Sequence, residues 1–163
     1  GDPRYLNEAA VVKMWGLRFM KPPDPVVHRE RKRIANRLER VLKLAPGDKL
    51  TLQAHNNLTY LYLMPPRDLD SAQQQLEALI QKLDAIYPSR TDWPPFILDT
   101  VVYANFRLRH ETEGATLAEM VRELRALATH VDFSSREREW VQSHIAEIRD
   151  VLRTAEAKTA FAG

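Results

Sequence analysis

The sequence predicts an all-α fold, a stack of antiparallel helical hairpins, and three observations support this prediction. Apolar residues recur at helical spacing in about seven stretches, each bounded by proline, glycine or a capping residue. The 163 residues include only 5 Gly and no strongly alternating apolar and polar run, so an extensive β-sheet is not expected. One segment recurs at a fixed distance, which is typical of stacked hairpins that cannot bury their apolar faces alone.

The recurrence has a period of 43 residues. The segment Ala54–Leu63 corresponds to Val11–Met20 on one side and to Ile97–Phe106 on the other, each displaced by 43 residues. The large side chains that match in register are Trp15 with Leu58 and Val101, Leu17 with Tyr60 and Tyr103, and Met20 with Leu63 and Phe106. We therefore expect three hairpins, each of which begins with one of these segments.

The first hairpin is delimited by acidic residues and prolines. Asp2 is expected to cap a helix that continues to Lys21, because a short acidic side chain accepts a bond from the first turn. The segment Pro22–Pro25 stops that helix, and Asp24 is expected to cap the second one, which continues to about Leu44. The inward stripe of the second helix comprises Val27, Ile34, Leu38, Val41, Leu42 and Ala45.

The second hairpin begins after a glycine turn. Gly47 tolerates the left-handed conformation that ends a helix, and Asp48 is expected to cap the third helix, Lys49–Leu63. Asp70, with Gln73 three residues later, resembles a capping box for the fourth helix. The inward stripe of the fourth helix comprises Leu76, Leu79, Ile80, Leu83 and Ile86.

The third hairpin and a closing helix complete the stack. Thr91 or Asp92 is expected to cap the fifth helix, which continues to about Arg109. Capping boxes at Thr116–Glu119 and Ser134–Glu137 are expected to open the sixth and seventh helices. Their inward stripes comprise Leu117, Val121, Leu124, Leu127 and Val131, and then Trp140, Val141, Ile145, Ile148 and Leu152. We expect one domain over residues 1–155 and a frayed tail over residues 156–163.

The composition excludes several classes of function. The absence of Cys excludes disulfides, thiolate metal sites and thiol chemistry, and it fits a cytoplasmic protein. No apolar run approaches the roughly 18 residues of a membrane span. A net charge of +2 is too small to indicate a polyanionic partner by itself. No phosphate-binding glycine loop, nucleophile elbow or paired-histidine zinc motif is present, so we expect neither an enzyme nor a cofactor or metal.

Three segments resemble tetratricopeptide repeats. His55–Tyr62, followed by Asp68–Ala72, is similar to the first helix, the turn and the second-helix entry of that family. Trp15 and Gly16, with Phe19 after them, resemble its large–small pair and later aromatic residue. The segment Ile97–Tyr103 is similar to the variant found in later repeats. The resemblance covers roughly residues 9–132 and rests on a loose apolar pattern.

The resemblance implies a right-handed stack of about seven helices, in which the first helices of the hairpins line a concave groove. A protein of this kind is a scaffold or regulatory module that binds a peptide or a partner domain in the groove. The groove residues that it implies are Lys13, Leu17, Met20, Asn56, Tyr60, Leu63, Asp99, Tyr103 and Phe106. The three aromatic side chains among them, Tyr60, Tyr103 and Phe106, have an alternative role in packing between hairpins, because apolar residues at helical spacing mostly mark burial.

Two departures from the family are visible, the length of the period and a slip of the second-helix stripes, which match at spacings of 42 to 45 residues instead of 43. The period of 43 exceeds the family's 34, and hairpins of the HEAT type, with periods of about 40–47, remain the structural alternative. Leu17 occupies the position at which the family's carboxylate clamp needs an asparagine, so a reader of chaperone tails is not expected. The sequence does not specify an oligomeric state.

A second functional hypothesis comes from a basic helix. The segment His28–Lys43 contains seven Lys or Arg and two Glu, a net charge of +5. The cations that cluster away from its apolar stripe are Arg29, Lys32, Arg33, Arg40 and Lys43. These residues would form the contact surface of a nucleic-acid-binding helical domain. The alternative is a solvated outer face, since few aromatic residues are interleaved and charge runs are usually solvated.

Overall fold

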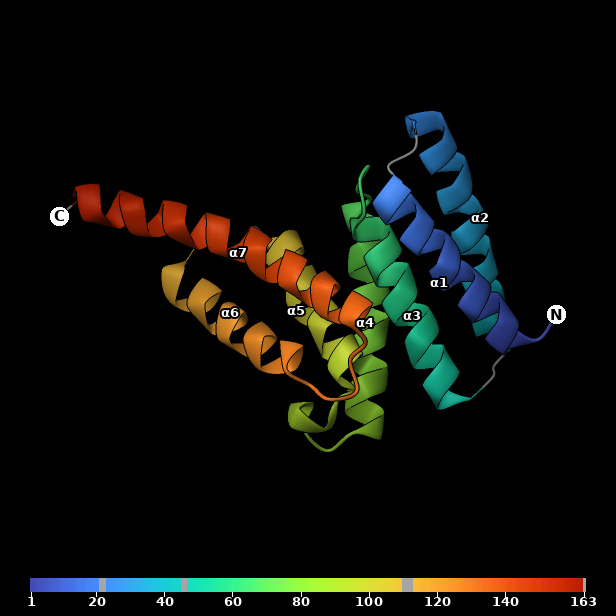
Figure 1. The fold of residues 1–163 in the computed structure, drawn as a ribbon. Coiled ribbons are helices and arrows are strands. Elements are labelled where there is room, and N and C mark those ends of the chain that lie inside the picture. Colours follow the sequence, from blue (N-terminus) through green and yellow to red (C-terminus); the bar gives the residue numbers. More distant parts are fainter. Residues whose placement is uncertain (21–22, 45–46, 110–112, 163) are drawn as a thin grey trace. The chain divides into compact units, whose positions relative to one another are not determined.

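The computed structural model confirms the all-α fold (Figure 1). It describes residues 1–20, 23–44, 47–109 and 113–162, and over these ranges the chain forms helices and no strand. The chain divides into two compact units, Gly1–Trp93 and Pro94–Gly163, here called the N-terminal and C-terminal units. The single continuous stack over residues 1–155 therefore stays a prediction.

The helices follow the predicted order. The N-terminal unit contains α1 (Pro3–Met20), α2 (Asp24–Lys43), α3 (Asp48–Leu63), α4 (Leu69–Ile86) and the short 3-10 helix η1 (Arg90–Asp92). The C-terminal unit contains α5 (Pro95–Arg109), α6 (Gly114–Ala128) and α7 (Ser135–Ala162). The three recurring segments lie in α1, α3 and α5, so the sequence period corresponds to a helix–loop–helix period.

In the N-terminal unit, α3 is the central element. It packs against α1, α2 and α4, and α1 also packs along α2. The side chains of Leu58 and Leu61, both in the recurring segment, are 0% exposed. α2 adds Ile34, Leu38 and Val41, and α4 adds Leu76, Leu79 and Leu83. These residues of the predicted stripes therefore meet around α3, which contacts both helices of the preceding hairpin. Ile86 was wrongly predicted to face inward, because it is 36% exposed at the end of α4, and Ala45 lies outside the described residues.

In the C-terminal unit, α6 lies along α7, and α5 contacts both. The predicted stripes of α6 and α7 face this core, with Leu117, Val121 and Leu124 on one helix and Trp140, Val141, Ile145 and Ile148 on the other. Val131 is an exception, because it lies beyond the end of α6 and is 85% exposed. α7 continues to Ala162, so residues 156–162 of the 156–163 stretch for which we expected fraying are helical, and Gly163 lies outside the described residues.

Two of the predicted helix caps form as the sequence indicates. Asp2 accepts a hydrogen bond from the backbone N–H of Arg4 at 2.8 Å and so caps α1. At the start of α7, Ser134 and Glu137 form the reciprocal capping box. The Glu137 N–H donates to Ser134 Oγ and the Ser134 N–H donates to Glu137 Oε1, each at 3.2 Å. α7 therefore begins where the sequence predicts.

Other predicted caps are wrong by one to three positions. Asp24 and Asp48 lie inside the first turns of α2 and α3, where their negative charges interact favourably with the positive end of the helix dipole. Gly47, at the N-terminus of α3, has the left-handed φ of 97° that favours glycine. α6 begins at Gly114, two residues before the predicted box at Thr116. Thr91 and Asp92 do not cap α5, because both lie in η1.

The cap of α4 is Asp68 rather than Asp70. Its carboxylate accepts hydrogen bonds from the Ser71 N–H at 3.1 Å and from the Ser71 hydroxyl at 2.8 Å. Asp70 lies in the first turn instead. Both residues are acidic and two positions apart, so the sequence alone does not separate the cap from the first-turn position.

The two aspartates provide a matched prediction. We expect Asp68→Ala to lower the free energy of unfolding by about 1 kcal/mol, because two donors of Ser71 lose their acceptor. We expect Asp70→Ala to cost less, about 0.3 kcal/mol, because this exposed side chain loses only its interaction with the helix dipole. Urea titration of both variants measures the difference. An equal or larger loss for Asp70→Ala would contradict the assignment of the cap.

Candidate functional site

The predicted groove residues are mostly buried. In the N-terminal unit, Lys13 is exposed and Leu17 is half-buried, and the side chain of Met20 lies outside the described residues. The other six, three from each unit, are at most 5% exposed: Asn56, Tyr60, Leu63, Asp99, Tyr103 and Phe106. These six are interior side chains. A groove shared by the two units stays a prediction.

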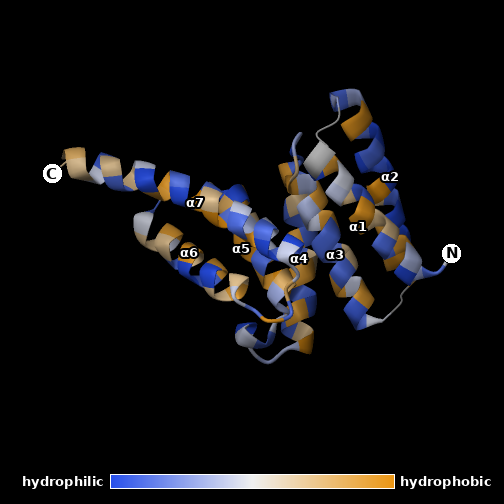
Figure 2. Ribbon diagram, viewed as in Figure 1, coloured by the Kyte–Doolittle hydropathy of each residue, from blue (hydrophilic) through white to orange (hydrophobic). Residues whose placement is uncertain are grey.

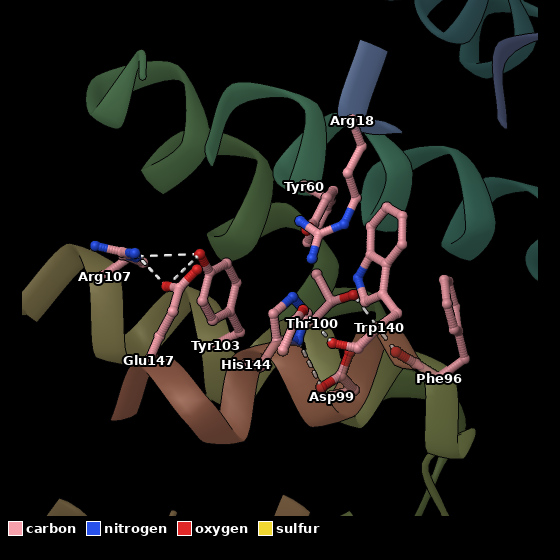
Figure 3. Close-up of polar contacts among 11 residues, drawn as sticks. Arg18, Tyr60, Phe96, Asp99, Thr100, Tyr103, Arg107, Trp140, His144 and Glu147 are labelled. Atoms are coloured by element: carbon pink, nitrogen blue, oxygen red, sulfur yellow. Dashed lines mark hydrogen bonds and ion pairs between the residues drawn. The ribbon is translucent and has the colours of Figure 1, made fainter. Parts of the chain in front are cut away.

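Polar groups join α1 to α3 inside the N-terminal unit. Arg18 Nη1 donates a hydrogen bond to the hydroxyl of Tyr60 at 2.9 Å (Figure 3). Asn57 Nδ2 donates to Asn7 Oδ1 at 3.0 Å, and Asn7 Nδ2 donates to Gln53 Oε1 at 3.3 Å. Buried amides are costly unless they are paired. These bonds therefore fix how α3 lies against α1, and they give Tyr60 a positioning role inside the hairpin pair.

The C-terminal unit buries a carboxylate and an imidazole together. Asp99 on α5 and His144 on α7 are both 0% exposed, and His144 Nδ1 lies 2.9 Å from Asp99 Oδ1. The Tyr103 ring stacks on the imidazole, with centroids 3.9 Å apart and planes 12° from parallel. Trp140 meets the same imidazole edge-on at 6.2 Å. Figure 3 shows these side chains around His144. The pair therefore joins α5 to α7 through one buried polar contact, which packs against the rings of Tyr103 and Trp140.

A second polar contact between the same helices lies at the other edge of Tyr103. The Tyr103 hydroxyl donates to Glu147 Oε2 at 2.8 Å, and Arg107 Nε donates to the Tyr103 oxygen at 3.1 Å (Figure 3). Arg107 also forms an ion pair with Glu147. Burial raises the pKa of Tyr103, and the Glu147 carboxylate raises it further, so the phenol stays protonated and donates.

This cluster has the features of a structural element. A general base or a nucleophile must reach a substrate, whereas the Asp99–His144 pair has no exposed atom. Among the described residues, no group of three or more His, Cys, Asp or Glu side chains is arranged to hold a metal ion. The sequence reasoning missed the pair. The sequence signal that could have revealed the pair is a polar residue, Asp99 or His144, at a position where the helical spacing of α5 or α7 calls for an apolar residue.

The basic residues of α2 lie on the surface. Arg29, Lys32, Arg33, Arg40 and Lys43, here called the basic face, are all exposed. Arg33 forms an ion pair with Glu30 at 2.7 Å. Within the described part of the chain, the other four have no ion-pair partner. The opposite face of α2 is the packed one, and Figure 2 shows hydrophilic and hydrophobic residues alternating along this helix.

Arg31, in the same basic segment, has a different role. Its Nη2 donates to the carbonyl oxygen of Met64 at 2.9 Å and also to that of Pro66, in the loop between α3 and α4. Burial lowers the pKa of Arg31, and the nearby Asp68 carboxylate partly offsets that effect. We refer to this arrangement as the carbonyl clamp. It ties α2 to the α3–α4 loop, so Arg31 does not belong to the basic face.

Comparisons with known proteins add no family. Searches against protein-family models, curated proteins and solved structures found no significant match. Over the described residues, no helix is both long and apolar enough to span a membrane.

Proposed function

We propose that this chain is a protein–protein interaction module, a scaffold or regulatory domain built from tetratricopeptide-like helical hairpins. The observation that carries the proposal is the position of α3, which packs against both helices of the preceding hairpin and against its own partner helix α4. Hairpins that contact their neighbours in this way form extended surfaces, and proteins built from them use those surfaces for binding.

The partner is expected on exposed helix faces. Six of the nine groove residues are interior side chains, so their first contribution is to hold hairpins together. Lys13 on α1 is an exposed member of the predicted groove, and the basic face of α2 is a separate exposed surface. The proposal therefore has two candidate contact surfaces within the N-terminal unit, and each can be tested by itself.

Site-specific photo-crosslinking in the native host tests the proposal without assuming a surface. A photoreactive amino acid is placed at one exposed position at a time: Lys13 on α1, Asn36 on α2, Lys82 on α4 or Arg125 on α6. We expect a discrete protein adduct at one or two of these positions and none at the others. Adducts at Lys13 would indicate the groove, and adducts at Asn36 would indicate α2. The absence of a protein adduct at all four positions would overturn the proposed function.

Nucleic-acid binding is the second candidate function, and the exposure of the basic face favours it. It predicts salt-sensitive association with duplex DNA or heparin that weakens when Arg33 and Arg40 are changed to Glu. In the crosslinking experiment it predicts nuclease-sensitive adducts at Asn36 in place of protein adducts. Its direct test is retention of the purified chain on duplex DNA at low salt.

A further inference from the structure

The basic face of α2 forms one row along the helix. Its members lie at positions i, i+3, i+4, i+11 and i+14 counted from Arg29, and the exposed Asn36 fills the i+7 position. Residues with this spacing share one side of a helix. Fourteen residues at about 1.5 Å per residue make the row roughly 21 Å long. The row is long enough to lie along several turns of another polypeptide segment.

The structure does not use this row for folding. α2 is held in the N-terminal unit by the opposite side of the helix, where Ile34, Leu38 and Val41 are 0% exposed. The carbonyl clamp of Arg31 adds a polar contact on that inner side. Of the five cations in the row, only Arg33 has an ion pair within the described residues, and that partner is Glu30 of the same helix. Like charges placed side by side destabilise an isolated helix. The row therefore carries repulsion that a bound anion would relieve.

Charge distribution favours a short acidic segment over a long polyanion. The segment His28–Lys43 carries +5 and the whole chain +2, so the remaining residues carry a net −3. The excess positive charge is therefore confined to this segment of α2, which matches a short acidic segment better than a long polyanion. Glu39 is exposed on α2 close to the row and would repel a uniform phosphate backbone. A protein segment can place a neutral or basic residue opposite Glu39.

Aromatic residues support the same choice. α2 contains no Phe, Tyr or Trp. Proteins that bind single-stranded nucleic acids combine a basic groove with aromatic rings on which bases stack. Without such rings on α2, the row offers charge and a few hydrogen-bond donors. An acidic protein segment needs those two features and no stacking surface.

We propose that the basic face of α2 docks an acidic segment of a partner protein. The inference rests on the proposed interaction function and names the surface and the chemistry of the partner. Exposed ion pairs contribute about 0.2–1 kcal/mol each. Several pairs along the row give binding that is weak for one segment, is specific for carboxylate spacing and is reduced by salt. Arg and Lys both contribute mainly as charges, since the row is solvent-exposed.

The test uses the purified 163-residue chain and a fluorescein-labelled helical peptide with glutamates along one face. The matched probes are the same peptide with Gln for Glu, and a short DNA duplex. We expect the Glu peptide to bind at low salt and the Gln peptide not to bind. We expect Arg33→Glu combined with Arg40→Glu to weaken binding of the Glu peptide by about tenfold or more, as measured by fluorescence anisotropy. The control is Lys82→Glu combined with Arg149→Glu, which makes the same change in net charge at exposed positions of α4 and α7.

The outcomes separate this inference from the proposed function. Equal weakening by the α2 and control variants would overturn the inference, because net charge alone would then explain binding. Tighter binding of the duplex than of the Glu peptide, abolished by the α2 variant, would overturn it in favour of nucleic acid. Protein adducts that form at Lys13 and persist in the α2 variant would leave the interaction function standing and remove α2 as its surface. Circular dichroism of each variant checks that the helices are retained.

Discussion

Replacing His144 with alanine is expected to lower the free energy of unfolding by about 3–5 kcal/mol. The imidazole lies 2.9 Å from Asp99 Oδ1, and both side chains are 0% exposed. The other carboxylate oxygen, Oδ2, already has no hydrogen-bond partner among the described residues. Removal of the imidazole would leave the buried Asp99 carboxylate without its polar partner. This lowers the free energy of unfolding more than replacing both side chains by apolar ones does. Urea unfolding of the full chain, followed by circular dichroism, measures the change.

A matched control and a double variant isolate the cause. Gln142, two positions before His144 on α7, is exposed, and Gln142→Ala is expected to change stability by less than about 0.5 kcal/mol. Asp99→Leu combined with His144→Leu is expected to cost less than the sum of the two single changes, because neither polar group is then left alone. Additive losses, or a loss below about 1 kcal/mol for His144→Ala, would show that the two side chains are not energetically coupled.

Replacing Leu58 with alanine is expected to cost about 2–5 kcal/mol, the range for a leucine removed from a well-packed core. Leu58 is 0% exposed and lies in the middle of α3, the helix that contacts α1, α2 and α4. Loss of its side chain removes apolar contacts and leaves a cavity, since neighbouring helices cannot fully close around it. The change in urea midpoint, with the slope checked for constancy, gives the value.

Leu44 is the control for this prediction. It is also a leucine of the N-terminal unit, but it follows the last residue of α2 and is 46% exposed. Leu44→Ala is therefore expected to stay within about 0.5 kcal/mol of the unchanged protein. If the two leucines cost the same, the recurring segment of α3 would not be the central packing element that its burial indicates.

The apolar core was predictable from the sequence because burial repeats with the helical period. Leu58, Leu79 and Leu124 are each spaced with other apolar residues along a helix, and each is 0% exposed. Helix starts were less predictable. Asp68 and Asp70 are chemically alike, and only the position of the loop before α4 brings the first of them onto Ser71. Which of the two aspartates caps α4 depends on the backbone geometry of the loop, and residue preferences for capping do not predict that geometry.

A candidate site was predictable from the sequence only where the position of a residue around its helix determines whether the side chain is exposed. The basic face was predicted as exposed because Arg29 and Arg40 lie opposite the apolar stripe of α2. The matching of Tyr60 and Tyr103 was visible in sequence, and their helical spacing with other apolar residues indicated the burial that the structure shows. The Asp99–His144 pair joins residues on different helices. Such a pairing depends on how α5 and α7 lie against each other, which no local pattern specifies.

Because of the carbonyl clamp, Arg31 is expected to tolerate fewer substitutions than the cations of the basic face. On the basic face, a lysine and an arginine deliver the same charge, so natural variants can exchange one for the other there. Arg31 reaches two backbone oxygens, of Met64 and Pro66, with one planar guanidinium. A lysine ammonium is a compact, strongly hydrated charge and is a poor replacement at that position. Drift between Lys and Arg in related sequences would therefore be free along the outer row and restricted at residue 31.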